Sequence, residues 1–210
     1  IPLGAWRLPA RALMLGYVIA AAILPLAALL LVSLQGFWSP DINWEKLGFQ
    51  NYVYVFTEKP VVVEAMKNSI LLGLGVAVAG MAVASVLSYH VARRPGIVTR
   101  VVDNMAMLPA TIPHIIMGVA FLVAFTPRPF SLYGTTTLLF LAYLAVYMPQ
   151  AMQSSKFAFS QVSPELMEAS RVFGAGELKS FVRIMLPLIL PSTVAGVLIL
   201  AVLTLVETNA

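Results

Sequence analysis

Ionisable side chains are scarce in this sequence, and the few that could do chemistry stand apart from one another. The chain has two histidines, His90 and His114, nine acidic residues and no cysteine. An enzyme would need paired carboxylates, a histidine-rich metal set or a serine with a base, but Asp103 and Glu207 are isolated acids at the edges of apolar runs. Thiolate zinc sites and Gly-x-x-x-x-Gly-Lys-Ser/Thr phosphate loops are also absent. The sequence therefore predicts no catalytic residue, no metal site and no cofactor in this chain.

Composition indicates a bilayer environment. Sixty per cent of the residues are apolar, 10% are charged and the mean hydropathy is +0.90, whereas a soluble domain is about 45–50% apolar with glycine included. The net charge of +4 would suggest nucleic acid in a soluble protein, but in a membrane protein the distribution of Lys and Arg among the loops is more informative. We therefore expect membrane lipid, and no nucleic acid, among the partners.

Five apolar windows approach the length that a membrane-spanning helix needs, which is about 20 residues. Because the bilayer core offers the backbone no hydrogen-bonding partner, such runs are expected to be helices. The predicted fold class is therefore all-α, a polytopic transmembrane helix bundle forming a single domain over residues 1–210. The windows cover residues 12–34, 69–92, 105–125, 135–152 and 188–206.

Basic residues predict the orientation, because cytoplasmic loops carry the excess of Lys and Arg. The larger set of basic residues comprises Arg7, Arg11, Arg93, Arg94, Arg100, Lys156, Arg171, Lys179 and Arg183. The smaller set, on the other side, comprises Lys46, Lys59, Lys67 and Arg128. The amino terminus and residues 153–185 are then cytoplasmic, and residues 35–67 face outward, in a multi-pass protein of the inner membrane. Since the chain starts at Ile1 and five spans would leave its end outside, we expect a longer natural polypeptide with a sixth span.

Proline and glycine interrupt the third window, where Pro109, Pro113 and Gly118 surround His114. One interpretation is close packing, because small residues let helices approach and neighbouring helices satisfy the backbone groups that proline frees. The other is that residues 108–118 form a kinked segment lining a translocation path, as broken helices do in transporters. The second interpretation makes all four residues candidates for the path, although His114 could instead make a packing hydrogen bond inside the bundle.

A helix–turn–helix is predicted in the cytoplasmic stretch. Ser163 can cap a helix that begins with Pro164 and Glu165, and Gly174 can end it in a left-handed conformation. The next helix has an apolar face made by Leu178, Phe181, Val182 and Met185. Pro187 then marks re-entry into the membrane. The pair of helices would lie on the cytoplasmic ends of the bundle and leave the first helix accessible to a soluble partner.

The same stretch resembles the EAA signature of type I ABC importer permeases, which is written EAA, three residues, G, nine residues, then I-x-LP. All the spacings match, and the resemblance extends over about residues 51–205. The departure is a serine in place of the second alanine, which exchanges one small residue for another. The matching residues are Glu168, Ala169, Ser170, Gly174, Ile184, Leu186 and Pro187.

The resemblance implies a mechanical role. In such permeases the first helix of the loop docks in a cleft of a separate ATPase subunit, which binds ATP and Mg²⁺ and pushes that helix as the ATPase dimer closes. Other implied partners are a second permease half, identical, paralogous or fused, and a periplasmic or extracellular substrate-binding protein. Within an expected coupling loop over 153–187, the contact residues would be Glu165, Glu168, Ala169, Ser170, Arg171, Gly174, Ile184, Leu186 and Pro187.

The amino-terminal span and long outer loop resemble the branch that includes ferric-iron, polyamine, thiamine and sulfate permeases. Residues 1–7 resemble the junction before the second half of fused ferric-iron-type permeases. Ferric iron is therefore the first expectation for the solute, with polyamine, thiamine or sulfate as alternatives. An ion-coupled secondary transporter, the remaining alternative, would need ionisable groups within the spans, where His114 is the exception at mid-depth.

Overall fold

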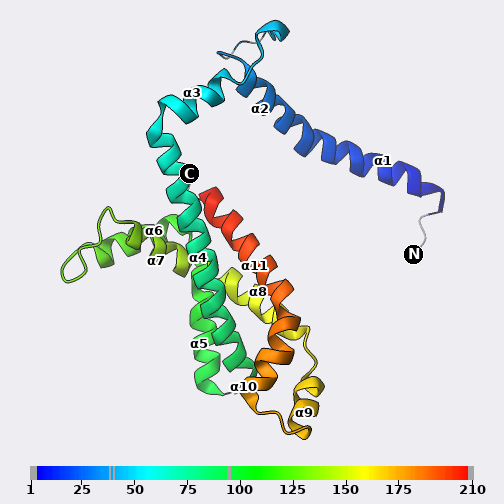
Figure 1. Ribbon diagram of the computed structural model, residues 1–210, viewed down its shortest axis with the longest axis vertical. Helices are drawn as coiled ribbons and strands as arrows, with labels where there is room; N and C mark the ends of the chain where they lie inside the picture. Colours follow the sequence, from blue (N-terminus) through cyan, green and yellow to red (C-terminus); the bar gives the residue numbers. More distant parts are fainter. Residues whose placement is uncertain (1–3, 38, 40, 94–95, 208–210) are drawn as a thin grey trace. The chain divides into compact units, whose positions relative to one another are not determined.

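The computed structural model describes residues 4–37, 39, 41–93 and 96–207, and the regular elements in these ranges are all helical (Figure 1). The predicted all-α fold class is confirmed. The chain divides into two compact units, Ile1–Met66 and Lys67–Ala210, and each is described by itself. That residues 1–210 act as a single permease domain stays a prediction.

The first unit is built on one long apolar helix, Arg7–Leu34, which contains an 18-residue window with a mean hydropathy of 2.5 and has exposed side chains. Its elements are a 3₁₀ turn (Gly4–Trp6), α1 (Arg7–Val18), a π-helical turn (Ile19–Ile23), α2 (Leu24–Leu34), a second 3₁₀ turn (Trp44–Lys46) and α3 (Gln50–Glu58). The amide of Asn51 donates to the carbonyl of Ser33 at 3.0 Å, and the Tyr52 hydroxyl lies 2.6 Å from that of Ser33. These contacts tie α3 to the end of α2.

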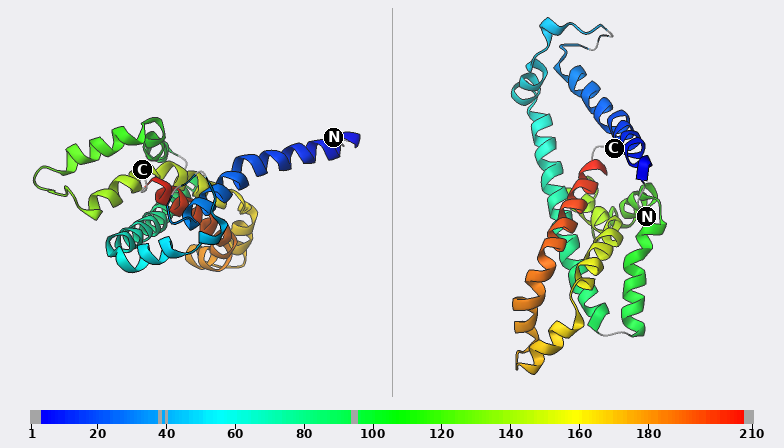
Figure 2. Two further views of the ribbon diagram at one scale, coloured as in Figure 1. Left: turned by 90° about the horizontal axis from the view of Figure 1, so that it is seen from above. Right: turned by 90° about the vertical axis from the view of Figure 1, so that its right-hand side faces the viewer.

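The second unit contains most of α4 and the remaining helices. Its elements are α4 (Pro60–Arg93), α5 (Ile97–Met107), a 3₁₀ turn (Leu108–Thr111), α6 (His114–Phe125), α7 (Thr136–Val146), α8 (Met148–Ser160), α9 (Pro164–Val172), α10 (Glu177–Ser180), a π-helical turn (Phe181–Met185) and α11 (Leu186–Glu207). In Figures 1 and 2, α9 and α10 lie at the same end of this unit as the end of α4 and the start of α5. This is the arrangement that the predicted topology requires, while the sidedness itself stays a prediction.

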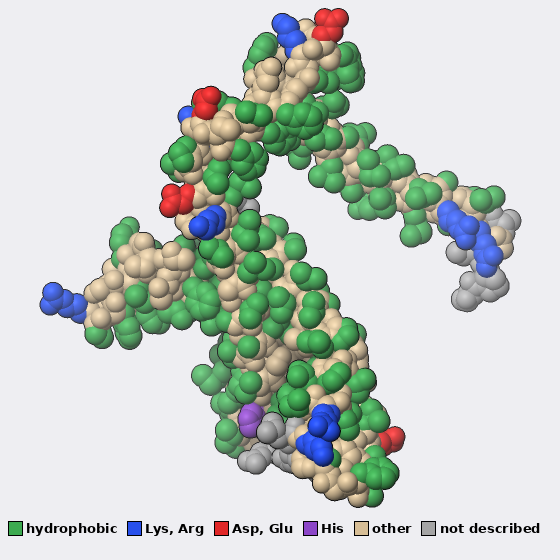
Figure 3. All heavy atoms as spheres, viewed as in Figure 1, with side chains coloured by type: hydrophobic (Ala, Val, Ile, Leu, Met, Phe, Trp, Pro, Cys, Tyr) green, Lys and Arg blue, Asp and Glu red, His purple; other side chains and the backbone are tan. Residues whose placement is uncertain are grey.

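The core of the second unit lies where α4, α8 and α11 meet. Met81, Met152 and Leu200 are almost completely buried there, and small residues let the helix backbones approach. These small residues are Ala77, Ala84, Ala151 and Ala201. Hydrophobic side chains also cover much of the outer surface (Figure 3), as expected when lipid takes the place of water as solvent.

Gly196, on α11, marks a close approach of three helices. A Cβ added there would lie 3.0 Å from Sδ of Met81 on α4 and 3.1 Å from Cβ of Ser154 on α8. Both distances are shorter than ordinary van der Waals contact, so a larger residue would displace the Met81 or Ser154 side chain by a few tenths of an ångström. Glycine at this position therefore allows the close fit of α11 in the bundle.

Three of the five predicted windows are continuous helices, and the third window is broken. Arg7–Leu34, Pro60–Ala92 and Phe181–Glu207 are each long and apolar enough to cross a membrane. In the third window, Ile97–Thr111 and His114–Phe125 meet at 111°, as in a broken span or a re-entrant loop. The cause is Pro113, because a residue before proline is driven out of the helical conformation, and Ile112 is extended at φ −110° and ψ 128°. The kink expected within residues 108–118 is confirmed.

The fourth window, residues 135–152, is also divided. Helix α7 ends at Val146, and α8 begins at Met148 after Tyr147, whose ψ of 3° departs from helical values. Pro149 has no N–H to donate to the carbonyl four residues before it, so the helical ladder is interrupted there. The prediction of one uninterrupted span is wrong for this window. Residues 153–160, expected in the cytoplasmic loop, instead extend α8.

Both π-helical turns come directly before prolines. Ile19–Ile23 ends two residues before Pro25, and Phe181–Met185 ends two residues before Pro187. The proline ring crowds the carbonyl four residues earlier, and a wider turn moves that carbonyl aside. The helices Arg7–Leu34 and Phe181–Glu207 thus stay continuous past Pro25 and Pro187.

Candidate functional site

The first helix of the predicted helix–turn–helix is confirmed as α9, and both its ends follow capping rules. At its start, the N–H of Glu165 donates to Oγ of Ser163 at 3.3 Å, as an N-cap does. At its end, the N–H of Ala175 donates to the carbonyl of Ser170 at 3.1 Å, and Gly174 has a φ of +78°. This bond and the left-handed residue define a Schellman C-cap. A Cβ at Gly174 would meet open space, so glycine is needed for its backbone conformation and not for clearance within the chain.

The inward side of α9 holds the helix to the bundle. Met167 is buried in a cluster with Ala158, Val162, Met185 and Ile189, which come from the end of α8 and the start of the last span. Ser170 is only 6% exposed, and its hydroxyl is hydrogen-bonded to that of Ser180 on α10. The residue that departs from the EAA pattern therefore joins the two helices of the motif and does not lie on the surface.

The outward side of α9 presents apolar side chains beside two carboxylates. Leu166, Val172 and Phe173 are 45%, 85% and 89% exposed, respectively. Glu165 and Glu168 are exposed alongside them, as is Ala169. Apolar side chains gathered on a projecting helix are typical of a surface that enters a groove of another protein. We call residues 163–187 the coupling segment and this outward side its docking face.

The remaining motif residues lie in the second half of the coupling segment. Ile184 is half-buried in the π-helical turn, while Leu186 and Pro187 are exposed at the start of α11. The apolar face predicted for this helix is only partly correct, because Val182 is exposed. Phe181, Val182 and Met185 lie within the π-helical turn, which is wider than an α-helical turn, so the α-helical spacing used to predict the face does not hold there. The side chains of Arg171 and Leu178 lie outside the described residues.

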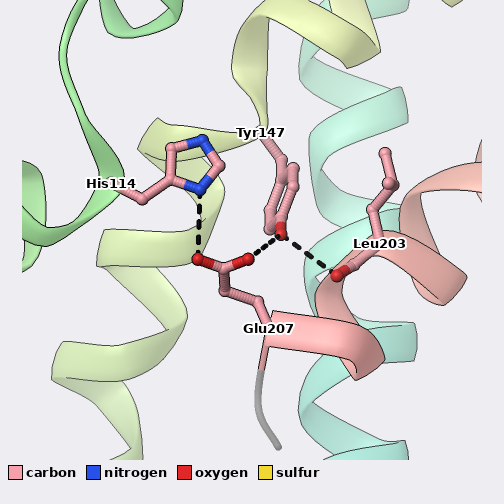
Figure 4. Close-up of polar contacts among 4 residues, drawn as sticks. All are labelled: His114, Tyr147, Leu203 and Glu207. Carbon is pink, nitrogen blue, oxygen red and sulfur yellow. Dashed lines mark hydrogen bonds and ion pairs between the residues drawn. The ribbon is translucent and has the colours of Figure 1, made fainter. Parts of the chain in front are cut away.

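A second group of polar residues lies at the other end of α11 (Figure 4). Nδ1 of His114, the first residue of α6, is 3.1 Å from Oε1 of Glu207, the last residue of α11. The hydroxyl of Tyr147 donates to the carbonyl of Leu203 at 3.0 Å and lies 3.5 Å from Oε2 of Glu207. The rings of His114 and Tyr147 are 5.9 Å apart and meet edge to face. We call His114, Tyr147 and Glu207 the polar cluster.

The four residues predicted for the translocation path all lie on or beside the break between α5 and α6. Pro109 is half-buried in the 3₁₀ turn, and Pro113 is the exposed residue directly before α6. Gly118 is exposed on α6, with no atoms within 4 Å of a Cβ placed on it. The four residues thus belong to one bent segment, and His114 is its link to the last span.

Another ion pair connects α5 and α8. Nζ of Lys156 lies 2.7 Å from Oδ2 of Asp103, and both side chains are partly buried. The sequence predicts Lys156 in the cytoplasmic loop, but the residue lies on α8 and faces α5. Its charge is therefore balanced within the bundle.

Sequence reasoning missed several residues of both regions. Ser180 carries no motif signal, and its partner was noted only as a conservative exchange. Tyr147 and Glu207 were not connected with His114, because 60 and 93 residues separate the contacting pairs. The one available signal was an ionisable residue at the end of an apolar run, since such residues are rare in spans and usually paired.

Comparison with known proteins agrees with both the fold and the motif. Residues 77–208 match the family described as binding-protein-dependent transport system inner membrane component. The molybdate/tungstate transport system permease protein WtpB of Pyrococcus abyssi is 31% identical over 137 residues, which are 65% of this chain and 54% of that protein. WtpB of Thermococcus kodakarensis is 28% identical over a region of the same extent.

A longer alignment covers 86% of this chain and 33% of the probable ABC transporter permease protein y4fN of Sinorhizobium fredii, at 28% identity. The chain spans about half the length of the WtpB proteins and a third of y4fN. The family match covers more than half of the chain and includes the coupling segment, the break between α5 and α6, and Glu207. The chain therefore belongs to the family of binding-protein-dependent transport system inner membrane components.

Proposed function

We propose that the chain forms part of the translocation pore of an ATP-driven importer and is moved by a separate ATPase. A second permease half, identical, paralogous or fused, would complete the pore. An external binding protein would deliver the solute, and ATP and Mg²⁺ would be bound by the ATPase dimer. The pore would lie in the inner membrane, with the amino terminus and the coupling segment in the cytoplasm.

The observation that carries this proposal is the docking face of α9. The helix is fastened to the bundle on one side by Met167 and the hydroxyl of Ser170, and on the other side it exposes Phe173 and Leu166 next to Glu168. An apolar surface of this kind is unfavourable in the cytoplasm unless a partner covers it. Because α9 leads through α10 directly into α11, a force on the docking face reaches a membrane helix within one short segment.

For the solute, we propose a tetrahedral oxyanion such as molybdate or tungstate. Support comes from the relatives, since both WtpB proteins carry molybdate/tungstate in their names. Ferric iron was the first expectation from the sequence, but none of the relatives described above is named for iron. Polyamine, thiamine and sulfate remain alternatives, of which sulfate shares the oxyanion chemistry.

The test is ATPase stimulation in the assembled complex. The natural permease is purified with its ATPase and binding protein, reconstituted in liposomes, and ATP hydrolysis is measured with molybdate, tungstate, sulfate, ferric citrate, spermidine or thiamine. We expect molybdate and tungstate to raise hydrolysis several-fold and the others to leave it unchanged. Stimulation by ferric citrate alone would overturn the oxyanion proposal, and failure of any ATPase to copurify would overturn the importer.

One observation favours a second candidate, an ion-coupled secondary transporter. Such a protein needs ionisable groups within the spans, and the contact between His114 and Glu207 pairs two ionisable groups at the start of α6 and the end of α11. The candidates differ in energy source. Uptake that continues without ATP and follows an imposed proton gradient would support the secondary transporter, whereas uptake that requires ATP inside the liposomes supports the importer.

The proposed sidedness can be tested separately, because the chain contains no cysteine. Single cysteines at Asn43 and Gly176 are labelled with an impermeant maleimide in right-side-out and inverted vesicles. We expect the first to react from outside and the second from inside. Reaction of both from the same side would contradict the topology.

A further inference from the structure

The polar cluster joins two segments whose principal packing partners are other helices. Helix α6 packs on α7, and α11 packs on α8, while His114 at the start of α6 reaches Glu207 at the end of α11. Tyr147, between α7 and α8, is buried and touches both of these side chains. The three residues come from the kinked segment, the divided fourth window and the last span, so they meet where the irregular helices of the second unit converge (Figure 4).

The contact brings together two ionisable groups from helices that are otherwise apolar. Ionisable residues in spans are rare, face the interior or a water-filled cavity, and mark pathways for ions or substrates. The side chains of His114 and Glu207 are 43% and 37% exposed among the described residues, so neither is buried within that part of the chain. Beside it, Ile115 and Gly118 are exposed on α6. Both residues belong to the segment proposed to line the path.

The contact with Glu207 determines which nitrogen His114 can offer to a solute. An ionised carboxylate only accepts hydrogen bonds, so with Glu207 ionised Nδ1 carries a hydrogen and donates it to Oε1. Nε2 points away from Glu207 (Figure 4) and has no hydrogen-bond partner in the described part of the chain. The carboxylate thus sets the orientation of the ring, as a partner on one ring nitrogen commonly does for histidine.

We propose that Glu207 and Tyr147 position His114 so that Nε2–H of its imidazolium form contacts a tetrahedral oxyanion during passage. This inference rests on the proposed function. The imidazolium and the carboxylate together carry no net charge, so the site attracts an anion less strongly than an isolated cation would. Weak attraction suits a path, because a solute must leave each site as readily as it enters.

The experiment measures ATP-driven uptake of radiolabelled molybdate by the full complex in liposomes. His114→Ala and Glu207→Ala are each expected to lower the uptake rate about tenfold, and Glu207→Asp is expected to stay within about threefold of wild type. Because Glu207 acts through His114, the double variant His114→Ala/Glu207→Ala is expected to match His114→Ala alone, since residues in one network are not additive. If Glu207→Ala inserts poorly, Glu207→Gln takes its place in the same comparison.

Asp103→Asn is the matched control, because it removes a carboxylate from a different ion pair of the same unit, between α5 and α8. We expect it to retain uptake within about twofold. Wild-type uptake from Glu207→Ala and Glu207→Gln, or a hundredfold loss in the double variant, would overturn the positioning role. If wild-type complex neither hydrolyses ATP nor takes up label in response to molybdate, the proposed solute fails, and with it this inference.

Discussion

The coupling segment and the polar cluster lie at opposite ends of α11 and are built in opposite ways. The coupling segment is held by contacts that are close in sequence, such as the Ser170–Ser180 pair ten residues apart and the cap at Gly174. The polar cluster joins residues 60 and 93 positions apart. A docking surface built locally can keep its shape while the bundle moves. A cluster built from distant helices changes whenever those helices move relative to one another.

In both regions the side chains differ in polarity from the medium proposed to surround them. The coupling segment exposes apolar side chains at the end of the unit assigned to the cytoplasm, and the polar cluster places ionisable ones among membrane helices. Exposed apolar area costs free energy until a partner covers it, and charged groups away from water are destabilised unless they are paired. The contrast fits the two proposed roles, a protein partner for the coupling segment and a small polar solute for the polar cluster.

The largest expected effect is on ATPase binding and import, and it comes from substitutions in the docking face that leave the polar cluster unchanged. Glu168→Lys places a cation where the ATPase is proposed to meet an anion, and opposing a buried charged partner costs about 2–5 kcal/mol. We expect affinity for the ATPase to fall about thirtyfold or more and import to stop.

Gly174→Asp should also weaken ATPase binding, because a side chain at a φ of +78° costs about 1 kcal/mol or more in backbone strain and adds a charge at the interface. Copurification of the ATPase subunit measures both.

Gly176→Asp is the matched control for Gly174→Asp. Gly176 lies in the same turn and has open space around it, but it lacks the left-handed conformation. We expect Gly176→Asp to retain clearly more ATPase than Gly174→Asp. Equal losses in the two variants would show that the backbone of the turn is unimportant, and full import by Glu168→Lys would remove the docking face from the mechanism.

A substitution near the midpoint of α11, between the coupling segment and the polar cluster, should lower the thermal stability of the helix bundle. Gly196→Ala forces a methyl group to within about 3 Å of Met81 and Ser154, and overpacking of this kind costs about 1–3 kcal/mol. We expect thermal unfolding in detergent to move several degrees lower. Gly16→Ala, on α1 with nothing within 4 Å, serves as the control and should be neutral or slightly stabilising. Equal midpoints for the two variants would contradict the close approach at Gly196.

The smallest expected effect is a difference in local stability between removing the Ser170 hydroxyl and removing the Ser180 hydroxyl. Ser170→Ala leaves the Ser180 hydroxyl donating to the carbonyl of Gly176 at 3.1 Å, so its cost should be under about 1 kcal/mol. Ser180→Ala leaves the buried Ser170 hydroxyl without a described partner, which costs about 1–3 kcal/mol. We expect hydrogen exchange at the backbone amides of Ala175 and Phe173 to speed up more in Ser180→Ala. The reverse order would contradict this assignment of partners.

The sequence predicted what depends on local rules. The capping residues predicted where α9 begins and ends, and Pro113 predicted the break between α5 and α6. Both predictions depend only on backbone geometry within a few residues. The fourth window was misjudged because its apolar composition hides the interruption at Tyr147 and Pro149. The polar cluster could not be predicted, because its members come from three elements and their meeting depends on how α6 and α11 pack.

The close approach at Gly196 has a mechanical consequence. Helix α11 is 22 residues long, about 33 Å at 1.5 Å per residue, and Gly196 lies near its midpoint, wedged between α4 and α8. If α11 tilts as a rigid body about Gly196, its two ends move in opposite directions by similar distances. A displacement of a few ångströms at Leu186 would then move Glu207 far enough to break the contact between its carboxylate and His114.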